Sequence, residues 1–123
     1  MRITIDDEIL MKVTKPARYT GGEQNSIIKS EGSFDVRFAF CFPDVYEVGM
    51  SHLGLRILYH LINDKEYCYC ERVFAPWPDM EKEMRDNKIP LFSIETREPV
   101  GNFDIIGFTL QYEIQTICAF EVE

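Results

Sequence analysis

The residues of this 123-residue chain that could bind a ligand or do chemistry gather in one stretch, from Asp44 to Gly54. Asp44 and Glu47 lie three residues apart, and their carboxylates could act as acid and base or accept hydrogen bonds from a ligand. Acidic side chains ahead of a helix also serve as caps, so this alternative stays open. His52 lies near the start of a predicted helix and is a better functional candidate than His60.

A glycine-containing turn leads into the predicted helix. Residues 49–54 read Gly-Met-Ser-His-Leu-Gly, which has the G-x-x-x-x-G spacing of a phosphate-binding loop. Leu55 and Arg56 stand where that loop needs Lys and Ser or Thr, so a nucleoside triphosphatase is disfavoured. The free N–H groups of the turn could hold an anionic group or a polar cofactor tail, and the alternative is a tight connection between a strand and a helix. The positions expected to approach a ligand closely are Gly49, Ser51 and Gly54.

Metal binding has little support in the sequence. The two histidines lie eight residues apart, which on a helix is too far for both to bind one ion unaided. The four cysteines form no C-x-x-C pairs and are expected to be buried, reduced thiols. They are Cys41, Cys68, Cys70 and Cys118.

The candidate residues need a scaffold, and the apolar pattern predicts alternating strands and helices. Residues 34–42 are predicted to form a central strand, because the second half of the segment is apolar throughout and suits burial on both faces. A loop through Gly49 follows, and Ser51 is expected to cap a helix that runs to about Asn63. The further predicted elements are a strand over 67–74, a helix capped by Asp79 with Met80 and Met84 facing inward, a third apolar segment over 89–95, and a strand over 103–111.

The helix over 51–63 is predicted to be covered over much of its surface, because its apolar residues form two faces beside a single polar stripe. One face holds Leu55, Leu58 and Ile62, the other holds Ile57 and Leu61, and the stripe holds His52, Arg56, His60 and Asn63.

Residues 1–33 are predicted to form a unit of their own, with a helix, an arm and a short strand, ahead of an α/β domain over 34–123. Residues 6–13 suit a short, exposed helix, with acidic residues first and a lysine late. Residues 15–25 are a polar loop or arm, and Ile27 and Ile28 indicate a short strand.

The alternation of strands and helices predicts an α/β fold of Rossmann-like type: a mainly parallel sheet with flanking helices, preceded by the N-terminal arm. Ligands of such sheets bind at the carboxyl ends of the strands. Those ends are predicted at residues 43–51, 75–79 and 110–113, with Trp77 packing on the rim of the site.

The charge balance excludes one class of partner. The chain has 13 Lys and Arg against 21 Asp and Glu, a formal net charge of -8, and no cluster of basic residues that could neutralise phosphates. Direct binding of nucleic acid is therefore not expected. The apolar runs are too short to span a membrane, and the first fifteen residues do not resemble a signal peptide, so a cytoplasmic location without membrane contact is expected.

Four segments, in order along the chain, resemble the N-terminal region of a family of radical S-adenosylmethionine proteins that carry a cobalamin-binding-like domain. The resemblance covers about residues 13–114 and implies a cobalamin-binding-type α/β domain, incomplete at its C-terminal end, that precedes a catalytic barrel. The segments are KPARYTGGE at 15–23, FPDVYEVGMSHLGLRILY at 42–59, ERVFAPWPDM at 71–80 and FDIIGFTLQYE at 103–113.

The resemblance places the reactive chemistry outside this sequence. In the family, three cysteines of a C-x-x-x-C-x-x-C motif bind a 4Fe-4S cluster and S-adenosylmethionine binds its fourth iron. That motif is absent here, so the chain alone is expected to be a piece truncated before the barrel, with no catalytic residue, and the barrel is its expected partner.

Cobalamin is the cofactor that the resemblance implies for this domain. The D-x-H-x-x-G motif that binds cobalt is missing, because Met50 and Leu55 stand at its acid and glycine positions around His52. Two roles follow: an accessory module that binds the cofactor, or a module that docks on the barrel or selects its substrate without a cofactor. The residues expected to contact a cofactor are Asp44, Glu47, Gly49, Ser51, His52, Gly54 and Trp77.

Overall fold

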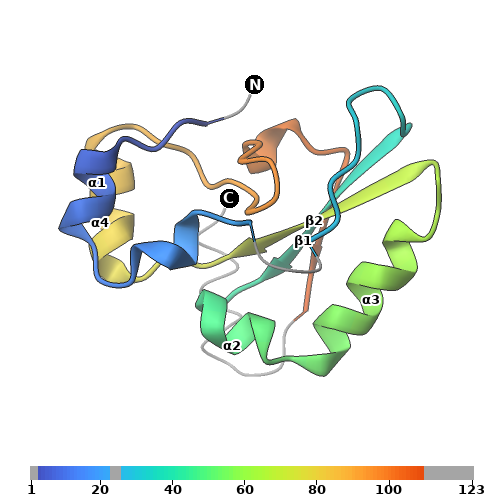
Figure 1. Cartoon of the computed structure of the whole chain (residues 1–123), viewed down its shortest axis with the longest axis horizontal. Helices are drawn as coiled ribbons and strands as arrows, with labels where there is room; N and C mark the ends of the chain where they lie inside the picture. The colour runs from blue at the N-terminus through green and yellow to red at the C-terminus, as the bar shows by residue number, and fades with distance from the viewer. Residues whose placement is uncertain (1–2, 23–25, 110–123) are drawn as a thin grey trace.

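The computed structural model describes residues 3–22 and 26–109, and at its centre is an open sheet of three parallel strands (Figure 1). The strand order is β2-β1-β3, with β1 over Val36–Phe42, β2 over Cys68–Phe74 and β3 over Ile105–Phe108. β1 is central because its second half is buried on both faces. The predicted α/β, Rossmann-like fold with a mainly parallel sheet is confirmed.

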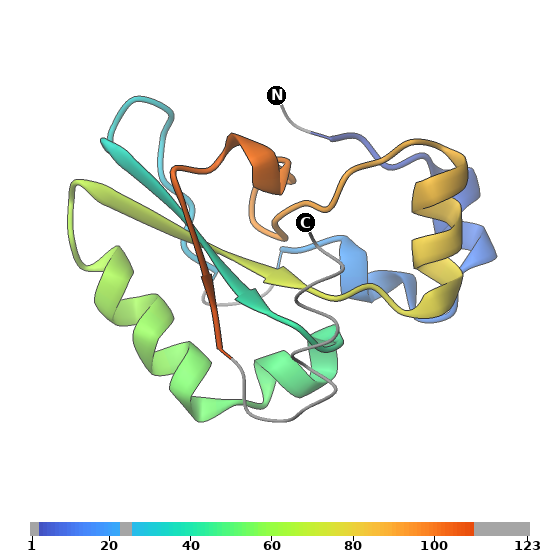
Figure 2. The same cartoon turned by 180° about the vertical axis from the view of Figure 1, so that it is seen from behind.

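Helix α3 (Leu53–Asn63) makes the crossover from β1 to β2 and covers one face of the sheet (Figure 2). Leu55 and Tyr59 are buried against Phe40, Phe42 and their neighbours in the largest core cluster. Asn63 was expected in the polar stripe, but it is buried. Its side chain exchanges hydrogen bonds with the backbone N–H and carbonyl of Cys70, so it ties the end of α3 to β2.

The second face of the sheet is covered by an irregular segment instead of a long helix. Val100 and Phe103, in and after the 3-10 turn η2 (Val100–Asn102), pack on Ala39, Cys41 and Val73. Residues 89–95, predicted as a third apolar segment, form no strand, and only Phe92 makes an isolated bridge, to Pro99. Leu91, Phe92 and Ile94 of this segment pack in or against the core clusters.

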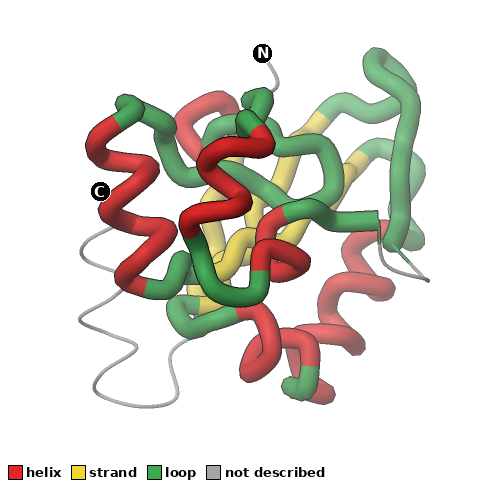
Figure 3. Tube along the Cα trace, turned by 60° about the vertical axis from the view of Figure 1, so that its left-hand side comes forward, coloured by secondary structure: helices red, strands yellow, loops and turns green. Residues whose placement is uncertain are grey.

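The N-terminal helix α1 (Asp7–Lys12) packs beside α4 (Pro78–Asp86) at one end of the molecule, as Figures 1, 2 and 3 show. Ile9 and Val13 are buried against Met80 and Met84. The prediction of an exposed lead-in helix was therefore wrong, because α4 offers an apolar side that α1 covers. The inward position of Met80 and Met84 is confirmed.

Asp79 does not cap α4, contrary to prediction. The helix begins at Pro78 with Trp77 at the cap position, because proline suits the first turn of a helix. The Asp79 carboxylate instead accepts hydrogen bonds from the backbone N–H and hydroxyl of Thr14, at 2.7 and 2.8 Å. It thereby holds the N-terminal segment against α4.

Ile27 and Ile28 form no strand, which also differs from the prediction. Their segment runs along the outer edge of β2, where side chains replace ladder hydrogen bonds. The Lys29 ammonium donates to the carbonyls of Asn63, Lys65 and Cys68, and the Ile27 N–H donates to the Tyr59 hydroxyl.

Two buried ion pairs lie on opposite faces of the sheet: one joins β1 to β2, and the other joins β2 to the irregular segment. On the second face, Arg37 binds Glu71 at 2.8 Å. On the α3 face, Arg72 binds Glu95 at 2.6 Å with side chains 6% and 0% exposed. Burial raises the pKa of the Glu95 carboxyl to about 7 and the Arg72 guanidinium opposes this rise, so Glu95 depends on Arg72 for its charge.

Replacing Glu95 by Ala is expected to lower the free energy of unfolding by about 3–5 kcal/mol, because it leaves the buried Arg72 guanidinium without its partner. Urea denaturation followed by circular dichroism measures the change. The matched control is Lys82→Ala, which breaks the exposed pair with Asp86 and should change the free energy by less than about 1 kcal/mol. Equal effects of the two substitutions would show that the buried pair does not hold the segment in place.

Candidate functional site

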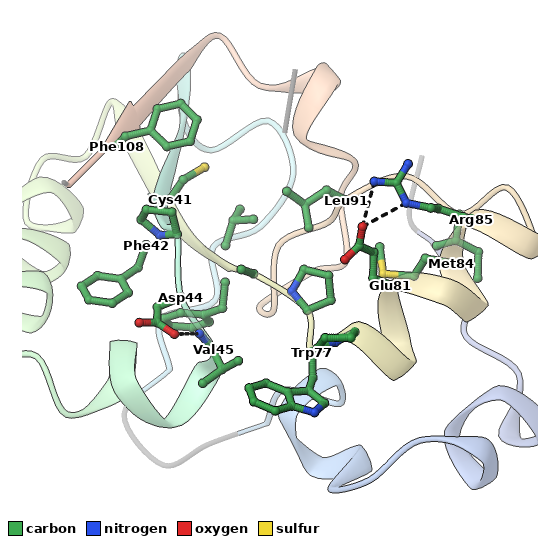
Figure 4. Close-up of a pocket in the computed structure, with 17 residues that line it drawn as sticks. Cys41, Phe42, Asp44, Val45, Trp77, Glu81, Met84, Arg85, Leu91 and Phe108 are labelled. Atoms are coloured by element: carbon green, nitrogen blue, oxygen red, sulfur yellow. Dashed lines mark hydrogen bonds and ion pairs between the residues drawn. The ribbon is translucent and has the colours of Figure 1, made fainter. Parts of the chain in front are cut away.

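A pocket of about 510 Å³ opens at the carboxyl ends of the strands (Figure 4). It lies beside the ends of β1 and β3. The chain leaves β1 for one neighbouring strand and later returns to the other side of β1, so this is a topological switch point of the sheet. The predicted location of a ligand site, at the strand ends, thus coincides with a real cavity. The third expected loop, 110–113, lies outside the described residues.

The described lining of the pocket is mainly apolar. Figure 4 shows Cys41 and Phe108 on the strand side and Met84 and Arg85 of α4 on the opposite side. The loop that follows β1 and the loop that follows β2 form the floor, tied together where the Ala75 N–H donates to the Asp44 carbonyl at 2.9 Å. The remaining lining residues are Phe42, Pro43, Val45, Val73, Phe74, Pro76, Trp77, Pro78, Glu81, Ile89 and Leu91.

The charged groups of the lining already have partners in the protein. The Asp44 carboxylate accepts a hydrogen bond from the Val45 N–H at 2.8 Å. Glu81 and Arg85 bind each other at 2.8 Å across one turn of α4. The pocket therefore presents an apolar surface with few polar anchoring points, which suits a small, mainly apolar ligand.

Of the predicted contact residues, the structure places Asp44 and Trp77 in the lining. The Trp77 side chain is 48% exposed, and the Arg18 guanidinium lies over its ring at 5.3 Å from the centroid. Contact of these two residues with a ligand stays a prediction.

Glu47 lies in α2 (Tyr46–Met50), outside the lining. The loop predicted to run through Gly49 is this short helix. Both Glu47 carboxylate oxygens accept from Arg18 Nε, at 2.8 and 2.9 Å, and this hydrogen bond lowers the pKa of Glu47. The pair fastens the N-terminal arm to α2.

His52, not Ser51, caps α3. The His52 Nδ1 accepts the Leu55 N–H at 3.0 Å, and its ring packs on Phe42 at 5.2 Å between centroids. Ser51 ends α2 instead, and its hydroxyl donates to the Glu47 carbonyl at 2.8 Å. The prediction for the cap was wrong because it did not anticipate α2, which moves the cap of α3 by one residue.

Gly49 and Gly54 are explained by internal packing. A Cβ on Gly49 would lie 2.0 Å from Cε1 of Phe74, and a Cβ on Gly54 would lie 2.9 Å from Cε1 of the His52 ring. The absent side chains make room for these rings. The approach of a ligand to either glycine, or to Ser51, stays a prediction.

The sequence reasoning did not single out several lining residues. Cys41 and Phe108 sit at strand ends facing the second side of the sheet, and alternation along the strands could have found them. Met84, Arg85 and Leu91 reach the pocket because α4 lies beyond the end of β2, a placement that no local pattern carries.

The fold and the pocket define a parallel α/β domain with its cavity at the switch point of the sheet. Residues 54–122 match a family model described as radical SAM proteins, N-terminal. This match covers more than half of the chain, which therefore belongs to the family of radical SAM N-terminal regions. No curated protein and no solved structure matches the chain.

Two further findings concern the described part of the chain only. It holds no group of three or more His, Cys, Asp or Glu side chains arranged to bind a metal ion. None of its helices combines the length and the apolar character needed to cross a bilayer.

Cys41 is expected to react with iodoacetamide at pH 8 roughly a thousandfold more slowly in the folded chain than in urea. Burial raises the pKa of its thiol to about 12, so the reactive thiolate is scarce until the pH approaches that value. Peptide mass spectrometry resolves Cys41 from the other cysteines. Similar rates in the two states would mean that the strand side of the pocket opens readily to solvent.

Proposed function

We propose that this chain is an accessory domain that docks on the catalytic region of a radical SAM protein. The observation that carries the proposal is an apolar band on α3 that no described residue covers. The α3 band consists of Leu53, Ile57, Leu58 and Leu61, whose side chains are between 44% and 66% exposed.

The band is a continuous stripe. Leu53, Ile57 and Leu61 follow at intervals of four residues, so their side chains lie one above the other on the helix. Leu58 extends the stripe toward the side of the helix that Leu55 buries. Single exposed apolar residues are normal on a protein surface, but a contiguous patch marks an interaction site.

The orientation of α3 shows where the band faces. Leu55 and Tyr59 are buried against the sheet. Leu53, Ile57 and Leu61 lie about half a turn away from them, so these side chains face away from the sheet. Leu58 lies on the flank between the two groups. A partner on the band therefore packs on the outer side of α3.

Family membership supports the choice of partner. The matching model describes N-terminal regions of radical SAM proteins, so a radical SAM catalytic region is the polypeptide with which such a domain is associated. A net charge of -8 on every copy disfavours packing of this face against a second copy of the chain.

Ile57→Asp is expected to weaken association with a separately expressed catalytic region of this family by more than about tenfold, because it places a charge in the apolar contact. His60→Asp is the matched control, since it puts the same charge on the polar side of the same helix. Both positions are exposed, so both variants should fold. Titration calorimetry measures the affinities, and equal losses for both variants would contradict docking through the α3 band.

The pocket supports a second candidate function, the binding of a small, mainly apolar ligand beside the catalytic region. Its volume of about 510 Å³ lies in the range of about 300–1,000 Å³ that is typical for drug-sized ligands. The sole tryptophan, Trp77, lies in the lining, so its fluorescence reports directly on occupancy.

The residues present fit cobalamin poorly. Cobalamin is much larger than a drug-sized molecule, and the candidate cobalt ligand His52 is engaged in capping α3 outside the described lining. Gly49 and Gly54 admit protein side chains in place of a cofactor. No role in cobalt chemistry is derived for these residues.

Cobalamin mixed with the purified chain is therefore expected to keep the visible spectrum of the free cofactor and to separate from the protein in gel filtration. The physical reason is that the His52 imidazole is engaged in capping α3 and the pocket is too small for cobalamin. Myoglobin-sized inert protein serves as the control for nonspecific retention. Co-elution with a spectral change that His52→Ala removes would contradict this expectation and restore the cofactor-binding role.

A further inference from the structure

We infer that β3 pairs along its outer edge with a parallel strand contributed by the catalytic region of a radical SAM protein. The inference rests on the proposed docking function and adds to it a backbone contact that would set the relative position of the two parts. Its basis is an asymmetry between the two edges of the sheet.

The edge formed by β2 is protected within the chain. Lys29 Nζ donates to the Cys68 carbonyl, and the Asn63 side chain exchanges hydrogen bonds with the backbone of Cys70. Further along the same edge, the Ile94 N–H donates to the Arg72 carbonyl at 3.0 Å. At the other edge, β3 is the outermost strand among residues 3–22 and 26–109. An apolar edge strand without cover is a site for pairing with another chain.

The side chains of β3 are those of an interior strand. Ile105 lies on the α3 face and Ile106 and Phe108 lie on the second face, according to their register with β1. All three are at least 36% exposed. Strands of parallel sheets that are apolar on both faces are normally covered on both, so β3 has the composition of a strand with a neighbour and covering helices on each side.

The backbone of β3 presents its polar groups to this edge. Just after β3, the Thr109 N–H donates to the Cys41 carbonyl of β1 at 3.3 Å. Because successive residues of a strand point their N–H groups to opposite sides, the amides of Ile105 and Gly107 also face β1 and those of Ile106 and Phe108 face outward. The outward pair is the template for a further strand.

The arrangement favours a strand of another polypeptide region over a second copy of this chain. Both strand pairs in the sheet are parallel, whereas two copies related by a twofold axis would join their β3 edges antiparallel. Two copies would also bring together charges of -8 each. A parallel strand followed by a helix, by contrast, would extend the sheet and place apolar surface over Ile105.

Hydrogen exchange followed by NMR on the whole chain tests the pairing, with the separately expressed catalytic region as the probe. In the complex, exchange of the Ile106 and Phe108 amides should slow by at least about tenfold. The internal controls are Ile105 and Gly107, whose amides face β1 and should already be protected in the free chain.

A pair of variants at one position adds an affinity measurement. Ile106→Pro removes an outward N–H, which an edge strand tolerates, while Ile106→Ala removes only side-chain contact. Ile106→Pro should bind the catalytic region about tenfold more weakly than Ile106→Ala.

The outcomes separate this inference from the proposed function. A complex that Ile57→Asp weakens, but in which the Ile106 and Phe108 amides exchange as in the free chain, overturns strand pairing and leaves docking intact. No complex at all overturns both. Protection of the same amides that rises with the concentration of the chain alone identifies a second copy as the occupant and overturns the choice of partner.

Discussion

The structure depends on the burial of β1 from both sides. The second half of this strand is apolar throughout, so its side chains must be covered on both faces of the sheet. Its backbone groups must also bond to a neighbouring strand on each edge. Parallel neighbours require crossovers, and the crossovers bring the carboxyl ends of the strands together at one rim. The pocket, the loops that line it and the packing of α3 all follow from this requirement.

Burial on both faces is achieved for β1 and β2 but not for β3. β1 and β2 are covered by α3 on one face and by the segment around η2 on the other. β3 repeats the two-sided apolar pattern but stays exposed on both faces, and the α3 band is exposed on the outer side of the helix. The apolar side chains of β3 and of the α3 band that stay exposed are what connect the fold to a role in a larger protein.

Polar side chains in this chain serve mainly to join segments. Arg72 with Glu95, Arg18 with Glu47 and Thr14 with Asp79 each link elements that are distant in sequence. Charged side chains that bind one another in this way are not available to bind a ligand. This explains why the stretch rich in candidate residues lies next to the pocket but contributes few groups to it.

The sequence by itself determined the alternation of strands and helices, the parallel sheet, the rim where a cavity forms and the membership of a radical SAM family, because burial patterns and segment order are local properties. Only the tertiary structure decided that His52 caps α3, that Gly49 and Gly54 make room for aromatic rings, and that α1 packs on α4. These depend on contacts between distant segments, Phe74 against Gly49 for example, and on the unpredicted helix α2, which no residue periodicity encodes.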